Sequence, residues 1–340
     1  MQPRQKESKK KPVNGRPRRS RRDRAHIAII GAGRLGTALG RALGGAGYKI
    51  EVVVARRLAR ARNAARLLDS DVLSLKSTQV DRLTPEQLKR FERSEVILIT
   101  TPDETIDAVV GQLALVFKAR SESNKNIPRS VRVALHASGA LSSEVLETLR
   151  EVGFAIGSLH PLVSVSDPVS GSKLFAGAFF SVEGDAAAKR EARKMVRDLG
   201  GQSFTLDSRM KALYHAAAVM ASGHVVALFD IALEILGRCG LSRRNAQKVL
   251  LPLLESTITN LASMAPPQAL TGTFARADLS TARKHLAAIK SEKSTEALSV
   301  YRLLGKRSIE LTRAAGVSRA DLDAIEAIMQ ETHAISSPAV

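Results

Sequence analysis

Short apolar runs alternate with helix-like spacing of apolar residues through the first 206 residues. Five runs of five or six mostly apolar residues, many of them β-branched, predict buried parallel strands. They lie at 26–30, 49–54, 95–100, 131–135 and 154–159, and two further strands are predicted at 178–182 and 203–206. Strands that alternate with helices are typical of a parallel sheet covered on both faces, so we expect a doubly wound α/β domain.

Strand-like patterns stop near Asp207, and helical patterns continue to Gln330. We therefore predict three parts: a basic tail over 1–24, the sheet domain over 25–206 and an all-helical domain over 207–335. The most apolar long stretch, Leu213 to Leu236, contains two histidines and two carboxylates. This composition predicts a buried helix rather than a membrane span.

The first predicted strand runs into a glycine-rich turn and then into a helical stretch at 37–46. Gly31 permits the tight turn, Gly33 lets the backbone approach a pyrophosphate, and Gly36 allows close packing of helix against strand. The helix N-terminus adds free N–H groups and a partial positive charge. An ordinary strand-to-helix turn is the alternative, but the context on both sides favours a dinucleotide site in a Rossmann fold. The residues predicted to hold the pyrophosphate are Gly31, Gly33, Arg34, Leu35 and Gly36.

The second predicted strand narrows the choice of dinucleotide. A site for NAD usually places a carboxylate at the end of this strand, roughly 20 residues past the glycines. This chain has Arg56 and Arg57 there, and guanidinium groups form forked hydrogen bonds to phosphate. We therefore predict that Arg56 contacts a ribose 2′-phosphate and that NADP is preferred over NAD. The alternative is that these arginines are the solvated start of a basic helix.

Polar residues follow three of the predicted strands, where ligands of such sheets bind. Thr101 and Pro102 follow the 95–100 strand, where a nicotinamide ring would pass unless this is an ordinary turn. Ser138 and His160 follow the next two strands, and we predict that they line a substrate pocket. A histidine at a strand end is also often a hydrogen-bonded structural residue, so that alternative stays open for His136 and His160.

Two polar groups stand out in the helical domain. Lys211 and His215 are four residues apart and share one helix face. Hydride transfer to a carbonyl or imine needs a proton donor, so Lys211 is the first candidate acid and His215 the second. The alternative is a surface lysine and a core histidine. Arg276 and Asp278 are predicted to contact an acidic substrate group, with a helix cap and a salt bridge as the alternative.

Charge and cysteine content limit the possible partners and the cellular compartment. The net charge is +19, and residues 1–24 hold 11 basic and 2 acidic residues with almost nothing apolar, so this tail is not expected to fold alone. Its charge could hold nucleic acid, but it lacks aromatic residues, and a solvated extension is favoured. The single cysteine, Cys239, excludes an internal disulfide and paired-cysteine zinc ligation. A single cysteine and the lack of an apolar secretory segment before Ala25 together favour a cytoplasmic location.

Several motifs between residues 24 and 316 resemble one family. They are the glycine turn, the segments 136–140, 157–162 and 211–222, and Thr271-Gly272 with Arg276, Asp278, Thr281, His285 and Leu286. The chain resembles Rossmann-like NAD(P)-binding oxidoreductases that carry an uncharacterised helical C-terminal domain. These are distant relatives of pyrroline-5-carboxylate reductases, ketopantoate reductases and β-hydroxyacid dehydrogenases. The β-hydroxyacid dehydrogenases use a helix Lys with an Asn four residues later, which Lys211 matches and His215 does not.

The resemblance implies a helical domain of the 6-phosphogluconate-dehydrogenase-like type that forms a homodimer through its helices. Three residues of that domain depart from the family's usual pattern. Gly223 stands where Asn is usual, Thr273 where Pro is usual, and Ala277 where Gly is usual. These departures leave the nucleotide motif intact and concern the half of the chain that would select the substrate.

Taken together, these features predict an NADP-dependent oxidoreductase. It would transfer a hydride between nicotinamide and the carbonyl or imine carbon of a small, acidic metabolite. A ketopantoate-type 2-oxo acid is the specific substrate that the resemblance suggests. The alternative is a non-catalytic NADP-binding regulator whose basic tail binds nucleic acid. Neither hypothesis involves a metal or a membrane.

Overall fold

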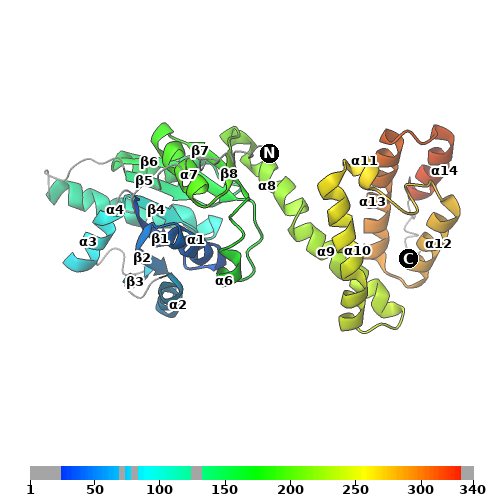
Figure 1. Ribbon diagram of the computed structural model, residues 1–340, viewed down its shortest axis with the longest axis horizontal. Coiled ribbons are helices and arrows are strands. Elements are labelled where there is room, and N and C mark those ends of the chain that lie inside the picture. The colour runs from blue at the N-terminus through cyan, green and yellow to red at the C-terminus, as the bar shows by residue number, and fades with distance from the viewer. Residues whose placement is uncertain (1–23, 69–72, 78–82, 124–131, 331–340) are drawn as a thin grey trace, which may run out of the picture. The chain divides into compact units, whose positions relative to one another are not determined.

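The computed structural model describes residues 24–68, 73–77, 83–123 and 132–330. The chain divides into two compact units, one ending at Val219 and the other beginning at Met220 (Figure 1). The predicted basic tail lies outside the described residues except for Arg24, whose guanidinium pairs with Asp198 at 3.5 Å.

The first unit is built on an eight-stranded sheet in the order β3-β2-β1-β4-β5-β6-β7-β8. All neighbouring strands run parallel except β6 and β7, which pair antiparallel. The strands span β1 His26–Ile30, β2 Lys49–Ala55, β3 Leu73–Lys76, β4 Val96–Ile99, β5 Arg132–His136, β6 Phe154–Pro161, β7 Phe179–Gly184 and β8 Gln202–Phe204.

Helices cover both faces of this sheet, and each face has its own apolar core. Alternate residues of a strand point to opposite faces, so Ile27 and Ile29 of β1 pack on one side while Ala28 and Ile30 pack on the other. The first face is covered by α1 (Arg34–Gly45), α2 (Leu58–Leu68) and α7 (Ala186–Asp198), and the second by α3 (Pro85–Arg93), α4 (Ile106–Ser123) and α5 (Glu147–Glu151). The predicted doubly wound α/β domain is confirmed.

The sequence indicates two helix starts: Thr84, followed by Pro85 and Gln87, has the pattern of a capping box, and Asp103 follows the 95–100 strand where it could cap the next helix. The structure gives them different outcomes. Thr84 caps α3 as a capping box: its hydroxyl accepts from Gln87 N, and the Gln87 side chain accepts from Thr84 N. Asp103 was expected to cap the next helix, and this expectation is wrong. A short 3₁₀ turn, Asp103–Thr105, precedes α4, and the Asp103 carboxylate instead accepts a hydrogen bond from the Ser138 hydroxyl at 2.8 Å.

The rest of the described chain is helical, as predicted. Helix α8 (Lys211–Met220) ends the first unit. The second unit contains α9 (Gly223–Arg238), α10 (Arg243–Ser263), α11 (Pro266–Ala269), α12 (Leu279–Ser291), α13 (Thr295–Ala314) and α14 (Arg319–Gln330). Its buried core lies among α12, α13 and α14, and includes Ala282, Ile309 and Leu322.

The apolar stretch Leu213–Leu236 was predicted to be a buried helix, and that prediction is wrong because Leu233 is its only buried residue and half of its residues are exposed. By length and composition, Ser208–Arg238 is long and apolar enough to cross a membrane, with a mean hydropathy of 1.8, and 6% of its most apolar window is buried. Side chains such as Leu213 and Val226 are 65% and 70% exposed in the described part of the chain.

Candidate functional site

The glycine turn between β1 and α1 forms one wall of a cavity of about 660 Å³. Seven of the eight predicted cofactor residues line it, namely Gly31, Gly33, Arg34, Leu35, Arg56, Thr101 and Pro102. Gly33 begins α1 without a side-chain cap, and nothing lies within 4 Å of the position of a Cβ there. The first-turn N–H groups of α1 therefore face an open, uncapped site that suits a phosphate.

Gly36, the eighth predicted residue, lies under the turn rather than in the cavity wall. A Cβ at this position would lie 2.2 Å from both Gly31 O and Thr100 Oγ1. Thr100 Oγ1 donates to Gly31 O at 2.7 Å, which ties the end of β4 to the turn. Gly31 itself has φ of +118°, a conformation that glycine adopts readily. These contacts leave no room for a side chain at Gly31 or Gly36.

The cavity is electropositive where it meets the end of β2. Arg56, Arg57 and Arg60 line it there together with Ser77, which follows β3. Among the described residues that line the cavity, Glu104 is the only carboxylate. The donor set fits a dinucleotide that carries an extra phosphate on its ribose, because three guanidinium groups line this end of the cavity and Arg56, not a carboxylate, follows β2.

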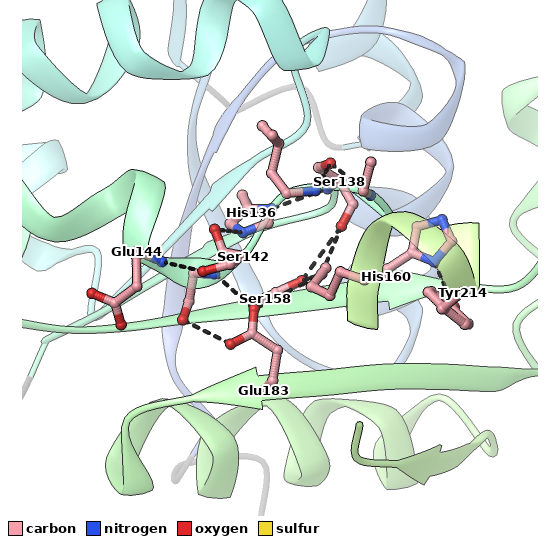
Figure 2. Close-up of polar contacts among 12 residues, drawn as sticks. His136, Ser138, Ser142, Glu144, Ser158, His160, Glu183 and Tyr214 are labelled. Carbon is pink, nitrogen blue, oxygen red and sulfur yellow. Dashed lines mark hydrogen bonds and ion pairs between the residues drawn. The ribbon is translucent and has the colours of Figure 1, made fainter. Parts of the chain in front are cut away.

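A second polar cluster lies at the carboxyl ends of β5 and β6 (Figure 2). Ser138 is nearly buried, and its hydroxyl is used within the chain: it donates to Asp103 and accepts from Ala140 N at 3.1 Å and Leu141 N at 3.0 Å. The hydroxyl therefore stabilises the turn, and a ligand beside this turn would contact backbone groups rather than the Ser138 hydroxyl. In the described part of the chain, the Gly139 N–H has no hydrogen-bond acceptor.

His136, at the end of β5, is a buried structural residue. Its Nδ1 accepts from Ser138 N at 3.1 Å, so its Nε2 carries the proton and donates to Ser142 O at 3.2 Å. Burial, with a further contribution from the Lys211 charge, lowers the pKa of His136 to about 3. The ring is therefore neutral at physiological pH and holds the turn between β5 and the following 3₁₀ segment.

Lys211 is completely buried beneath the same turn. Its Nζ donates to Ser138 O at 3.0 Å and to the Ser158 hydroxyl, and lies 3.9 Å from Glu183 Oε1. Glu183 in turn accepts from the N–H and hydroxyl of Ser143 at 2.7 and 2.8 Å. Burial lowers the pKa of Lys211 to about 8, although Glu183 and Asp103 favour the charged form. This network joins β5, β6, β7 and α8.

His160, near the end of β6, lies beside α8. Its Nδ1 is 2.8 Å from the Tyr214 hydroxyl, and its ring centroid is 5.6 Å from the ring of His215. Burial and the nearby Lys211 charge lower the pKa of His160 to about 4. A Cβ on Gly139 would lie 2.4 Å from His215 Cδ2 and 2.8 Å from His160 Nε2, so both rings close over the Gly139 backbone.

The structure thus brings Ser138, His160, Lys211 and His215 together, all in the first unit. Tyr214 belongs to this cluster and was missed by the sequence analysis, although its position three residues after Lys211 on a helix could have indicated it. Arg276 and Asp278 lie in the second unit. There Asp278 caps α12, accepting from Thr281 N at 2.9 Å and from its hydroxyl at 2.7 Å.

Comparisons with known proteins agree with this architecture. Residues 10–161 match the Rossmann-like domain, and residues 178–308 match the domain of unknown function DUF2520. A protein from Thermotoga maritima is 23% identical with a TM-score of 0.61, over 85% of this chain and 99% of that one. A candidate NADP oxidoreductase from Bacteroides fragilis is 20% identical with a TM-score of 0.65, over 84% and 98%.

An imine reductase from Myxococcus stipitatus, solved with NADP+, is 18% identical with a TM-score of 0.54, over 90% of this chain and all of that one. At these identities the likeness concerns the fold. No curated protein matches the chain. The two matched regions together confirm the resemblance seen in the sequence: the chain belongs to the proteins in which a Rossmann-like domain is followed by a DUF2520 domain.

Proposed function

We propose that this protein is an NADP-dependent oxidoreductase that transfers a hydride between nicotinamide and the carbonyl or imine carbon of a small, acidic metabolite. The observation that carries the proposal is the cavity in which the uncapped start of α1 and three arginines after β2 line one space. Structural neighbours named as an NADP oxidoreductase and as an imine reductase with NADP+ support it.

Different residues would bind the pyrophosphate, the 2′-phosphate and the nicotinamide of the dinucleotide. The first turn of α1 would hold the pyrophosphate, Arg56 would hold the 2′-phosphate, and Thr101 and Pro102 would border the nicotinamide. When bound, the nicotinamide supplies or accepts the hydride, while the protein positions the ring and the substrate. The carboxyl ends of β4, β5 and β6 lie side by side, so the polar cluster at Ser138 adjoins this wall of the cavity.

Lys211 and His215 are the proton-donor candidates that the sequence suggested, with Ser138, His160, Arg276 and Asp278 as substrate residues. Lys211 has no exposed surface, whereas the His215 ring is half-buried. A ketopantoate-type 2-oxo acid remains our specific substrate proposal, because a 2-oxo acid combines a reducible carbonyl with a carboxylate that an arginine can bind.

Coenzyme binding tests the proposal most directly. Titrations with NADPH and NADH are to be compared in the wild type, Arg56→Ala and the control Arg62→Ala, which removes an exposed arginine of α2 outside the cavity wall. Loss of a charged hydrogen bond is worth about 1.5–3 kcal/mol, so Arg56→Ala should weaken NADPH by about ten-fold or more and NADH little. Equal weakening of both coenzymes would remove the argument for the 2′-phosphate.

Turnover separates this proposal from the alternative of a regulator. An enzyme should oxidise NADPH with at least one member of a panel of 2-oxo acids, simple ketones and cyclic imines. A regulator would bind NADPH without turnover, and would bind DNA in a salt-dependent way that deletion of residues 1–24 abolishes. Normal NADPH binding with no turnover across the panel would favour the regulator.

We also propose that the protein is a homodimer formed through α9 and α10. On these helices the apolar side chains of Val226, Val249, Leu253 and Ile258 are each 55–70% exposed. An exposed apolar surface of this kind is typical of a protein–protein interface. A Leu253→Glu variant should sediment as a monomer, whereas Leu303→Glu, which charges an exposed position of α13, should not. Wild-type protein that sediments as a monomer, or that floats with lipid vesicles, would overturn this proposal.

A further inference from the structure

We infer that His160 delivers a proton to the carbonyl oxygen of the substrate, and that the Tyr214 hydroxyl holds His160 in the tautomer that allows this. The inference rests on the proposed hydride transfer and deepens it by naming the donor and the substrate class. Neither the glycine motif nor the pairing of Lys211 with His215 on one helix face indicates this role.

The position of His160 in the sheet supports this role. Strands β4, β5 and β6 are neighbours, with Ile99 opposite His136 and His136 opposite Ser158. His160 lies two residues beyond Ser158 on β6, and Val163 and Val165, just after that strand, line the cofactor cavity. His160 therefore lies at the edge of the sheet where Thr101 and Pro102 would border the nicotinamide.

The Tyr214 hydroxyl lies 2.8 Å from His160 Nδ1, a contact in which either group can be the donor. Burial raises the pKa of Tyr214 to about 12, so its hydroxyl keeps its proton at neutral pH, and we infer that it donates this proton to Nδ1. The low pKa of His160 keeps the ring neutral, and a neutral ring that accepts at Nδ1 carries its hydrogen on Nε2. Nε2 and Cε1 are the ring atoms nearest Gly139, each 2.8 Å from the position of a Cβ there. The Gly139 N–H, which has no acceptor among the described residues, gives the site a second donor.

These groups can complete the reduction of a carbonyl without any net charge left on the protein. The hydride forms the new C–H bond, the π pair of the C=O bond moves to oxygen, and the oxygen takes the Nε2 proton. As Nε2 loses its proton, the Tyr214 proton passes to Nδ1. The starting state returns when Nδ1 gives that proton back to the phenolate and Nε2 takes up one proton from solvent, so each turnover consumes one solvent proton. An alkoxide is a stronger base than a phenolate, so this transfer runs downhill. An iminium substrate becomes a neutral amine on hydride addition and needs no such donor, so the geometry points to a carbonyl substrate.

Lys211 then has a positioning role. Its ammonium holds Ser138 O and Ser158 Oγ, one on each of the two strand ends that place Gly139 and His160. Two of its protons have acceptors in these groups, Glu183 at 3.9 Å supplies the counter-charge, and none of its surface is exposed. A proton held in this way orders the turn beneath the substrate rather than leaving the site in each cycle.

The test has one readout that does not depend on turnover. Nitrogen-15 NMR of the histidine rings in the full chain reports the tautomer of each ring, and His160→Gln assigns the signal among the seven histidines. We expect His160 to be protonated on Nε2 and neutral at pH 7. Tyr214→Phe keeps the ring that packs on Phe204 but should convert His160 to a mixture of tautomers. A His160 protonated on Nδ1 in the wild type would overturn the inference whether or not a substrate is found.

Kinetics with a carbonyl substrate supply the second readout. General acid catalysis contributes about 100-fold or more, so His160→Gln should lower kcat at least about 100-fold with little change in KM. Tyr214→Phe should lower kcat less and alter the solvent isotope effect, while the exposed control His224→Gln should match the wild type. Unchanged kcat in His160→Gln would overturn the inference. Absence of any turnover, with the Nε2 tautomer in place, would instead count against the proposed function.

Discussion

Replacing Lys211 with methionine tests how the ends of β5, β6 and β7 are held together. Methionine has a similar length and no charge, so the side chain can still fill the buried site. The substitution removes the donor to Ser138 O and Ser158 Oγ and the only cation near Glu183 in the described network. Glu183 keeps its two hydrogen bonds from Ser143 but becomes a buried carboxylate without a counter-charge.

The size of the effect follows from that uncompensated charge. Removing one partner of a buried ion pair costs about 3–5 kcal/mol, and Glu183 is only 6% exposed. We therefore expect the free energy of unfolding of Lys211→Met to fall by about 3–5 kcal/mol at pH 7. Adding Glu183→Gln removes the stranded charge, so the double variant should recover about 1–3 kcal/mol.

Urea unfolding of the wild type, both single variants and the double variant measures these differences as a thermodynamic cycle. Lys194→Met is a suitable control, because that lysine is about one-third exposed and pairs with Glu191 three residues away on the same helix. It should change stability by less than about 1 kcal/mol. A loss below about 1 kcal/mol for Lys211→Met, or no coupling to Glu183→Gln, would refute the structural role assigned to this lysine.

Three further predictions concern other parts of the molecule. Ala277 has a φ of +51°, so Ala277→Gly should raise the free energy of unfolding by about 0.5 kcal/mol, whereas Ala287→Gly within α12 should lower it by about 1 kcal/mol; chemical denaturation measures both. Because burial lowers the pKa of His136 to about 3 from 6.5, the unfolded chain binds a proton between these pH values that the folded chain does not bind. Wild-type stability should therefore fall as the pH is lowered from 6.5 to 4, by up to about 3 kcal/mol, and His136→Gln should lose less over that range, as urea unfolding at each pH would measure. Gly33→Ala should weaken NADPH binding without changing the melting temperature, because no protein atom lies near the added methyl group. Gly36→Ala should weaken NADPH binding and also lower the melting temperature, because its methyl group would clash with Gly31 O and Thr100 Oγ1.

Local chemistry explains what the sequence predicted correctly. The capping box at Thr84 needs only residues three apart, and the glycine turn needs only a strand before it and a helix after it. Both patterns lie within a few residues, so they can be identified without knowledge of the rest of the fold. The apolar runs predicted most of the strands for the same reason, because a short run of apolar residues indicates a buried strand without reference to the rest of the chain.

Long-range arrangement explains what the sequence did not predict. An apolar run does not state the direction of a strand, so the antiparallel placement of β7 against β6 was not foreseen. The partner of Asp103 is Ser138, 35 residues away, and local capping rules could not indicate it. Likewise, an apolar helix pattern cannot say whether the chain itself covers the apolar face, and for Leu213–Leu236 it does not.

In the candidate site too, local patterns were predictable from the sequence and long-range contacts were not. Gly31, Gly33, Arg34 and Leu35, which the sequence singled out by a local pattern, line the cavity, whereas the contact between His160 and Tyr214 joins residues 54 apart. The sequence also gave no sign that Lys211 would be fully buried, because burial of a lysine depends on acceptors from other strands. These acceptors are Ser138 O, the Ser158 hydroxyl and the Glu183 carboxylate.

The reversal of direction between β6 and β7 links the coenzyme cavity to the far edge of the sheet. The connection from Leu162 to Ala178 places Val163 and Val165 in the cavity wall, then passes through α6 (Pro168–Gly171) before β7 begins. Leu162 N donates to Phe179 O, so the first residue of that connection is fastened to the first residue of β7. Occupancy of the cavity should therefore slow amide hydrogen exchange in β7 and β8, although neither strand lines the cavity.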